Sequence, residues 1–360
     1  MGKETCKKIL QTGKVDALLL TDSANMRYVA GFTGEGYVYI SDKQAIVVTD
    51  SRYTIAAKKE CPGFAVVEWK SKGYYAALQH AIKEDGVRRL GIEDEVMTVA
   101  GKNRLASSLA DAGLTEVQTD ELGLSVTECR QIKTAQEIRF IEEAEAIGDR
   151  AFSKLLTVLK AGMTEKQVAA WLEFFMKEEG AEGFSFDTIA ASGLNSAMPH
   201  AVPTDKKLEE GDFLTMDFGC LYRGYCSDMT RTVVIGQASD KQREIYETVL
   251  RAQETALQGI RPGMTGKEID ALARDVIVDA GYGEYFGHAL GHSVGLEIHE
   301  RPNFSAKEKT VIQPGMVITV EPGIYVEGIG GVRIEDVVII TEDGCENITH
   351  SPKELMEQKG

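Results

Sequence analysis

The residues best suited to chemistry in this sequence are acidic side chains that interrupt or adjoin apolar strand patterns. Asp217 falls in the run FLTMDF and Glu321 in MVITVEP, where the pattern would otherwise bury an aliphatic residue. Asp228 precedes the apolar run MTRTVVI, and Glu335 precedes DVVII. Carboxylates gathered in a buried place remain ionised only if cations neutralise them. The four positions therefore predict a cation site.

Histidines are concentrated in the same part of the chain. His288, His292 and His299 lie within the segment GHALGHSVGLEIHE, and His200 lies about ninety residues earlier. Glycine permits close backbone approach, and it occurs in this segment at Gly287, Gly291 and Gly295. We assign His292 to the cations and the other three histidines to the substrate.

Four carboxylates and one imidazole form an oxygen-rich ligand set, which suits hard or borderline divalent ions such as Mn²⁺ better than a closed structural zinc site. Two adjacent ions are typical of aminopeptidases, where they hold a bridging hydroxide as the nucleophile. Since five side chains would serve two ions, some carboxylates would bridge both. The lone histidines His80 and His350 are expected to be packed or exposed residues without a ligand role.

An internal repeat explains how these carboxylates could meet. The segment 161–183, AGMTEKQVAAWLEFFMKEEGAEG, matches 262–284, PGMTGKEIDALARDVIVDAGYGE, at an offset of 101 residues. GDFLTMDFG then matches GMVITVEPG at an offset of 104 residues, which places Asp217 on Glu321. Asp228 corresponds to Glu335 further on. Two halves related by a pseudo-two-fold axis would bring the four carboxylates to their centre.

The region before the repeat predicts a separate α/β domain. Short apolar runs alternate with helical patterns, which favours a mixed sheet. Strands are expected at 17–21, 37–41, 45–50 and 89–94, helices at 52–60 and 74–86, and a hairpin turn at 31–36. A long amphipathic helix begins at Thr134 with a capping box to Glu137. We predict domains at 1–128 and 129–360, with the catalytic groups in the second.

Charge, apolar runs and cysteine content indicate which partners and which cell compartment to expect. The chain has 360 residues and a formal net charge of −16, which disfavours nucleic acid as a partner. No apolar run is long enough to span a bilayer, and no secretory leader is recognisable. Six scattered cysteines without a CxxC pair are typical of reduced thiols. We therefore expect a cytoplasmic protein that does not bind membranes.

The motifs MDFG, SDMTRT, GHALGHSVG, VEPGIY and RIED, in this order and spacing, resemble those of the pita-bread metallopeptidases, and most of all the Xaa-Pro aminopeptidase and prolidase group. The resemblance covers essentially the whole second domain. SANMRYVAGFTG (23–34) and TDSRY (49–53) resemble the creatinase-type N-terminal domain of the same group. The implied fold is α+β, with a duplicated pita-bread catalytic domain after an α/β N-terminal domain.

The resemblance also implies roles for individual residues. The metal ligands would be Asp217, Asp228, His292, Glu321 and Glu335. The substrate site would be lined by His200, His288 and His299, with Arg333 supporting it and Glu321 also moving a proton. The implied cofactors are two divalent ions per chain, Mn²⁺ before Co²⁺ or Zn²⁺. The implied reaction releases the N-terminal residue from small peptides with proline in second position, by attack of a metal-bridging hydroxide.

Three alternatives remain open at this stage. A methionine aminopeptidase has a similar ligand set, although RIED and the N-terminal domain disfavour it. A non-catalytic peptide-binding relative would not need the intact ligands. The sequence also leaves aminopeptidase and dipeptidase open, and a homodimer is implied by the resemblance alone.

Overall fold

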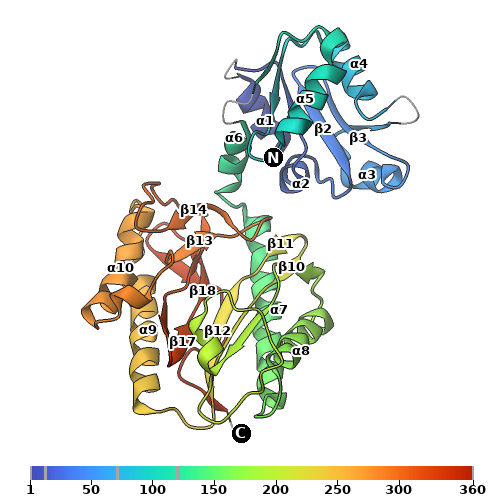
Figure 1. Ribbon diagram of the computed structural model, residues 1–360. Helices are drawn as coiled ribbons and strands as arrows, with labels where there is room; N and C mark the ends of the chain where they lie inside the picture. The colour runs from blue at the N-terminus through green and yellow to red at the C-terminus, as the bar shows by residue number, and fades with distance from the viewer. Residues whose placement is uncertain (1, 12–13, 70–72, 119–121, 359–360) are drawn as a thin grey trace. The chain divides into compact units, whose positions relative to one another are not determined.

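The chain divides into two units, Met1–Arg130 and Gln131–Gly360, each held together by its own contacts. Figure 1 shows the computed structural model, which describes residues 2–11, 14–69, 73–118 and 122–358. Among these residues no helix is both long and apolar enough to cross a membrane.

A six-stranded sheet in the order β4-β3-β2-β1-β5-β6 forms the middle of the first unit. β2 runs antiparallel to β1 and β3, and the remaining neighbours are parallel, so the predicted mixed sheet is confirmed. The strands are β1 (Ala17–Leu20), β2 (Gly36–Ser41), β3 (Ala45–Thr49), β4 (Ala65–Glu68), β5 (Arg89–Ile92) and β6 (Glu116–Gln118).

Helices cover both faces of this sheet. Successive side chains of a strand point to opposite faces. Leu18 and Leu20 accordingly share a core with residues of α1, α2, α3 and α6, whereas Ala17 and Leu19 share one with residues of α4 and α5. The helices are α1 (Gly2–Gln11), α2 (Ser23–Ala30), α3 (Thr54–Glu60), α4 (Ala76–Asp85), α5 (Val99–Ser108), the short η1 (Ala110–Ala112) and α6 (Leu122–Arg130).

The hairpin turn expected at 31–36 is wrong. The preceding residues form α2, which the Asp22 side chain caps by accepting from the Asn25 backbone N–H. Gly31 ends the helix in the left-handed region, at φ 79°, as glycine commonly does after a helix. The glycine-rich segment therefore connects a helix to β2.

The described residues of the second unit form four sheets and four long helices. The sheets have the orders β11-β10-β7, β20-β12-β9-β8, β14-β13-β15-β18-β19 and β16-β17. The helices are α7 (Ala135–Val158), α8 (Glu165–Glu178), η2 (Gly193–Ala197), α9 (Asp240–Gly259), α10 (Gly266–Asp279) and η3 (Gly283–Tyr285). The strands are β7 (Gly183–Phe184), β8 (Ile189–Ser192), β9 (Phe213–Phe218), β10 (Cys220–Tyr222), β11 (Tyr225–Cys226), β12 (Met229–Ile235), β13 (Gly291–Ser293), β14 (Glu300–Phe304), β15 (Val317–Val320), β16 (Gly323–Val326), β17 (Gly330–Arg333), β18 (Asp336–Ile340), β19 (Cys345–Asn347) and β20 (Glu357–Gln358).

The predicted duplication is visible in matched local geometry. Thr164 and Thr265 each cap a 14-residue helix, α8 and α10, with a capping box. Each of these threonines also forms an isolated antiparallel bridge, to Lys207 and Val311 respectively. The two strand pairs that follow, β9–β12 and β15–β18, are both antiparallel.

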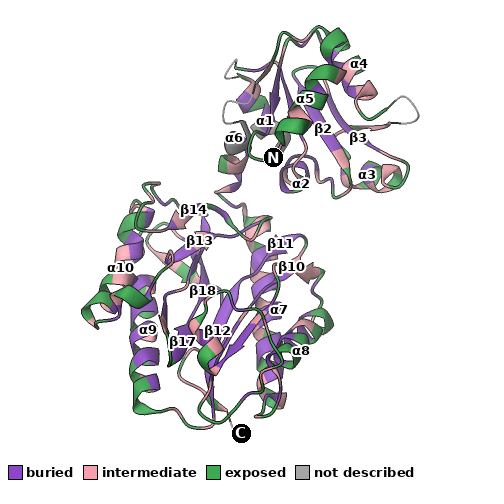
Figure 2. Cartoon of the chain, in the orientation of Figure 1, coloured by how far each residue is buried: buried purple, intermediate pink, exposed green. Residues whose placement is uncertain are grey.

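Strands from both halves lie side by side between the helices. The Glu335 backbone N–H donates to the Thr230 carbonyl at 3.1 Å, and the Thr215 hydroxyl donates to the Gly331 carbonyl at 3.1 Å. Figure 1 shows α7 and α8 on one side of the strands and α9 and α10 on the other. The strands are buried, whereas the helices expose their outer faces (Figure 2). The duplication therefore brings strands of both halves next to each other at the centre of the second unit.

Candidate metal centre and active site

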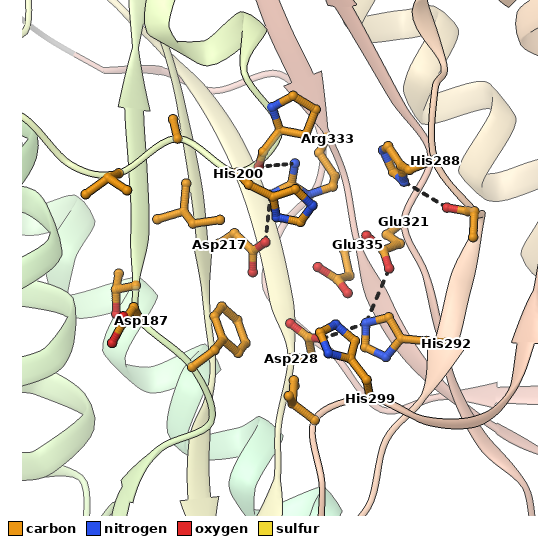
Figure 3. Close-up of a pocket in the computed structure, with 18 of the residues that line it drawn as sticks. Asp187, His200, Asp217, Asp228, His288, His292, His299, Glu321, Arg333 and Glu335 are labelled. Carbon is orange, nitrogen blue, oxygen red and sulfur yellow. Dashed lines mark hydrogen bonds and ion pairs between the residues drawn. The ribbon is translucent and has the colours of Figure 1, made fainter. Parts of the chain in front are cut away.

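Five side chains from the ends or interiors of five strands surround one space (Figure 3). Asp217 lies within β9, Asp228 directly before β12, His292 within β13, Glu321 directly after β15 and Glu335 directly before β18. Ligand atoms of Asp228, His292 and Glu335 lie within 4.8 Å of one another. His292 Nε2 lies 3.4 Å from Asp228 Oδ2 and 3.5 Å from Glu321 Oε1. The structure thus brings together all five side chains that the sequence assigned to cations.

The electrostatics of this cluster fit a divalent cation. Burial raises the pKa of Asp228 and of Glu335 well above the ordinary carboxyl range, and the neighbouring carboxylates raise both further. Burial also raises the pKa of Glu321. Asp217 Oδ1 is buried and has no hydrogen-bond partner. Such a set is costly unless positive charge compensates it, and the oxygen-rich donors suit hard or borderline divalent ions.

Glycine allows the histidine segment to lie against its neighbours at two of the three positions named above. A Cβ at Gly291 would lie 1.9 Å from the Thr319 carbonyl oxygen, so β13 can approach β15 only with glycine there. A Cβ at Gly295 would lie 2.5 Å from the Glu300 carboxylate. Gly287 has open space around its Cα, and our expectation of a close approach there is wrong.

Glu145 anchors Asp228 and was not found from the sequence. Glu145 Oε1 accepts the Asp228 backbone N–H at 2.8 Å, and Oε2 accepts the Thr349 hydroxyl at 3.0 Å. Burial raises the pKa of Glu145 to about 8. Its only trace in the sequence is an acidic residue on the apolar face of α7, between Ala144 and Ile147.

Arg333 connects the cluster to the substrate-facing wall. This arginine is buried, and its Nη2 donates to Asp217 Oδ2 at 2.6 Å. Its Nη1 donates to the Tyr325 hydroxyl at 2.8 Å and to the Pro199 carbonyl at 3.3 Å. Arg333 binds Oδ2 of Asp217, whereas Oδ1 has no hydrogen-bond partner and is available to a cation. Tyr325 was not singled out from the sequence, although it ends the motif VEPGIY.

His288 is held through both of its ring nitrogens. Nδ1 lies 2.8 Å from the Ala289 carbonyl oxygen, and Nε2 lies 3.0 Å from the Tyr325 hydroxyl. Burial, followed by the charge of Arg333, lowers the pKa of His288 to about 4, so the ring is neutral at neutral pH. A carbonyl accepts only from a protonated nitrogen, so Nδ1 carries the proton and Nε2 accepts from Tyr325.

His299 packs directly on the candidate ligand His292. Their ring centroids are 4.4 Å apart with the rings at 65° to each other. Burial lowers the pKa of His299, and the neighbouring His292 lowers it further. His200 comes from the loop after η2 and lies beside Arg333 and Asp217 in the view of Figure 3, whereas His299 lies beside His292 and Asp228. His80 lies in α4 of the first unit with its side chain 82% exposed, and His350 is also exposed.

A cavity of about 480 Å³ contains the whole constellation. All nine residues assigned from the sequence line it: His200, Asp217, Asp228, His288, His292, His299, Glu321, Arg333 and Glu335. Ten further residues line it. Asp187 and Thr188 are polar, and the others are apolar: Phe186, Ile189, Pro199, Ala201, Val202, Pro203, Ala289 and Ile298. Charged groups together with a largely apolar lining suit a small amphipathic ligand.

Comparison with known proteins agrees with this geometry. Residues 139–342 match the family model Metallopeptidase family M24, and residues 3–132 match the Creatinase/Prolidase N-terminal domain. The chain belongs to metallopeptidase family M24. Its fold is the expected one, a creatinase-type N-terminal domain followed by a duplicated pita-bread domain, and it is a hydrolase of the metallopeptidase class.

Relatives within this family extend over almost the entire chain. It is 41% identical to an Xaa-Pro dipeptidase of Pyrococcus horikoshii, over 98% of this chain and 99% of the relative. The solved structure of an Xaa-Pro dipeptidase from Bacillus anthracis is 45% identical, covers 99% of this chain and 98% of its own, and superposes with a TM-score of 0.92. The X-Pro aminopeptidase from Thermotoga maritima is 40% identical, covers 95% of this chain and 97% of its own, and has a TM-score of 0.89.

Proposed function

We propose that this chain hydrolyses the bond after the first residue of small peptides that carry proline in second position. The observation that carries the proposal is the similarity to Xaa-Pro dipeptidase, which spans 98% of the chain at 41% identity. The complete set of candidate metal ligands in the cavity favours an enzyme over a non-catalytic peptide-binding protein. Buried carboxylates with raised pKa values are costly in a protein that does not bind cations.

Two divalent cations, with Mn²⁺ as our first choice, are the proposed cofactors. Their ligands would be Asp217, Asp228, His292, Glu321 and Glu335. Divalent ions in such a centre neutralise the carboxylates, polarise the peptide carbonyl and activate a water molecule near neutral pH. Arg333 holds Asp217 through its hydrogen bond to Oδ2, which would leave Oδ1 available to bind a cation.

The remaining polar groups would act on the peptide. His299 and His200 both line the cavity and would donate to the carbonyl on which charge develops. Neutral His288 is fixed by Tyr325 and shapes the wall beside Glu321. We assign Glu321 the transfer of a proton from the attacking water to the leaving proline nitrogen, because its carboxylate borders the cavity.

The apolar lining of the cavity supports the proposed preference for proline. A proline nitrogen in a peptide bond carries no hydrogen, so a site that depends on that donor binds the bond poorly. Here the wall of Phe186, Ile189, Val202 and Ile298 offers apolar surface for the ring without requiring the donor. The free α-amino group of the peptide would lie on the side of the carboxylates.

Hydrolysis by the Mn²⁺-loaded chain tests the proposal directly. We expect turnover of Xaa-Pro and Xaa-Pro-Yaa peptides and none of the same peptides with an acetylated amino terminus. The ratio of the two rates decides between dipeptidase and aminopeptidase, both of which occur among the relatives. Rapid cleavage of methionyl-alanyl peptides with no cleavage of any Xaa-Pro peptide would instead identify a methionine aminopeptidase. Absence of metal binding would favour the non-catalytic alternative.

A further inference from the structure

The buried carboxylate of Glu165 joins the two ends of the loop that carries His200. Glu165 Oε1 accepts from the Ser192 backbone N–H at 2.6 Å and from its hydroxyl at 2.8 Å. Glu165 Oε2 accepts from the Thr204 backbone N–H at 2.9 Å and from its hydroxyl at 2.6 Å. The two oxygens of one side chain therefore hold opposite ends of the loop 193–203.

The Glu165 carboxylate is buried, and its hydrogen bonds go to this loop and its two ends. Its residue has no exposed surface, and Asn195 Nδ2 adds a further hydrogen bond to Oε1 at 3.1 Å. Burial acts to raise the pKa of Glu165, but the hydrogen bonds from Thr204 and Ser192 outweigh burial and lower it. Charge-assisted hydrogen bonds of this kind are among the stronger ones in proteins.

The duplication shows that the helix itself does not need this glutamate. Thr164 caps α8 with Gln167, so the capping box is complete without Glu165. In the second half the matching position is Gly266, where any Cβ would lie 2.2 Å from the Asn303 carbonyl oxygen. α10 is nevertheless capped by Thr265 in the same way. The glutamate is thus specific to the half that contains the His200 loop.

The loop that Glu165 closes supplies a continuous part of the cavity wall, namely Pro199, His200, Ala201, Val202 and Pro203. Its tip is tied to the catalytic strands at two further points. Gly331 N–H donates to the Ser196 hydroxyl at 2.9 Å, and Arg333 Nη1 donates to the Pro199 carbonyl at 3.3 Å. The position of this wall therefore depends on the loop keeping one conformation.

We propose that Glu165 is a positioning residue for peptide recognition, which holds His200 and the apolar wall beside it at the distance that a peptide substrate requires. The inference rests on the proposed function, because it assigns the loop to peptide binding. Glu165 touches none of the five candidate metal ligands. Its loss should therefore impair peptide binding and leave the metals in place.

The variant Glu165→Gln tests the proposal with almost no change in volume. A glutamine has one accepting oxygen and one NH₂ donor. Its oxygen can bind one end of the loop, but its NH₂ group cannot accept hydrogen bonds from the donors at the other end. In the Mn²⁺-loaded variant we expect unchanged metal content, a raised KM and a loss in kcat/KM of about tenfold to a hundredfold, as a misplacement of ~1 Å can produce. A merely structural defect would reduce the active fraction and lower kcat with KM unchanged.

Lys166→Ala is the matched control. Lys166 and Asp205 form an exposed ion pair between the same two segments, with Nζ and Oδ2 2.9 Å apart. Its removal should leave KM unchanged. Thr204→Val removes the hydroxyl that donates to Glu165 and accepts the Lys206 backbone N–H, but it keeps the Thr204 backbone bond to Glu165. It should give a smaller defect in the same direction as Glu165→Gln. This milder variant keeps the test valid if Glu165→Gln does not fold.

Hydrogen exchange of the loop provides a readout that does not depend on activity. In Glu165→Gln, whichever amide of Ser192 or Thr204 loses its accepting oxygen should exchange faster than in the wild type or Lys166→Ala. If the wild type fails to cleave Xaa-Pro peptides, the proposed function is wrong, and the exchange data still decide whether Glu165 holds the loop. Unchanged exchange, an unchanged KM, or loss of metal from Glu165→Gln would each overturn the inference.

Discussion

Replacing the candidate ligand Glu335 by glutamine should change stability in opposite directions with and without metal. In the metal-free chain, ligand atoms of Glu335 and Asp228 lie within 4.8 Å of each other, and both residues are almost fully buried. At an effective dielectric constant of about 20, two unit charges at that distance repel by about 3 kcal/mol. Protonation relieves part of this repulsion. Glu335→Gln should therefore stabilise the metal-free second unit by about 1 to 3 kcal/mol at pH 8.

The pH dependence follows from the raised pKa of Glu335. The native state binds this proton more tightly than the unfolded state, so the destabilisation is absent below the ordinary carboxyl range and grows as the pH rises above it. The advantage of Glu335→Gln should thus shrink between pH 8 and pH 5. The Thr230 hydroxyl donates to Glu335 Oε2 at 2.7 Å, and a glutamine oxygen can accept the same bond. With saturating Mn²⁺ the order should reverse, since only the wild type gains the full ligand stabilisation, about 2.7 kcal/mol at a hundredfold excess over Kd.

Tryptophan fluorescence allows this assay to follow the second unit alone. The chain contains two tryptophans, Trp69 in the first unit and Trp171 in α8. In a Trp69→Phe background, urea unfolding monitored at Trp171 reports the second unit. A metal-free Glu335→Gln variant that is less stable than the wild type at pH 8, or that binds Mn²⁺ as tightly, would refute the reasoning.

Three further predictions concern neighbouring residues. Asp228→Ala should lose at least one metal ion and most of the activity while keeping the fold, as metal analysis and circular dichroism can check; two ions bound at full occupancy would contradict the assignment. His299→Ala should keep both ions and lose about 10²–10³-fold in kcat, with His80→Ala as the control. Lys133 Nζ lies 3.1 Å from Glu300 Oε2, and both side chains are 2% exposed. Lys133→Met should therefore lower the free energy of unfolding in urea by about 3–5 kcal/mol, and adding Glu300→Gln should restore a part of it. Additive losses in the double variant would contradict a coupled pair.

The sequence by itself predicted a shared centre of acidic side chains and the internal duplication around it. A carboxylate inside an apolar strand pattern is a local feature, and its recurrence at Asp217 and Glu321 within matched segments pointed to a shared centre. The capping boxes at Thr164 and Thr265 are equally local, since all their partners lie within three residues. Local patterns of this kind could therefore be recognised in the sequence alone. The structure places all nine assigned residues around one cavity.

Only the tertiary structure decided how those side chains are held. Glu145 supports Asp228 from 83 positions away and meets Thr349 across 204, so no sequence window contains both partners. Glu165 and Tyr325 likewise act on segments that packing alone brings near them. In the first unit, the glycine-rich residues 31–36 looked like a hairpin turn, because the helix before them is short and its end depends on Gly31 adopting φ 79°. Partners set by the packing of distant segments leave no local pattern, and a polar residue on a buried face is the only trace that the sequence retains of them.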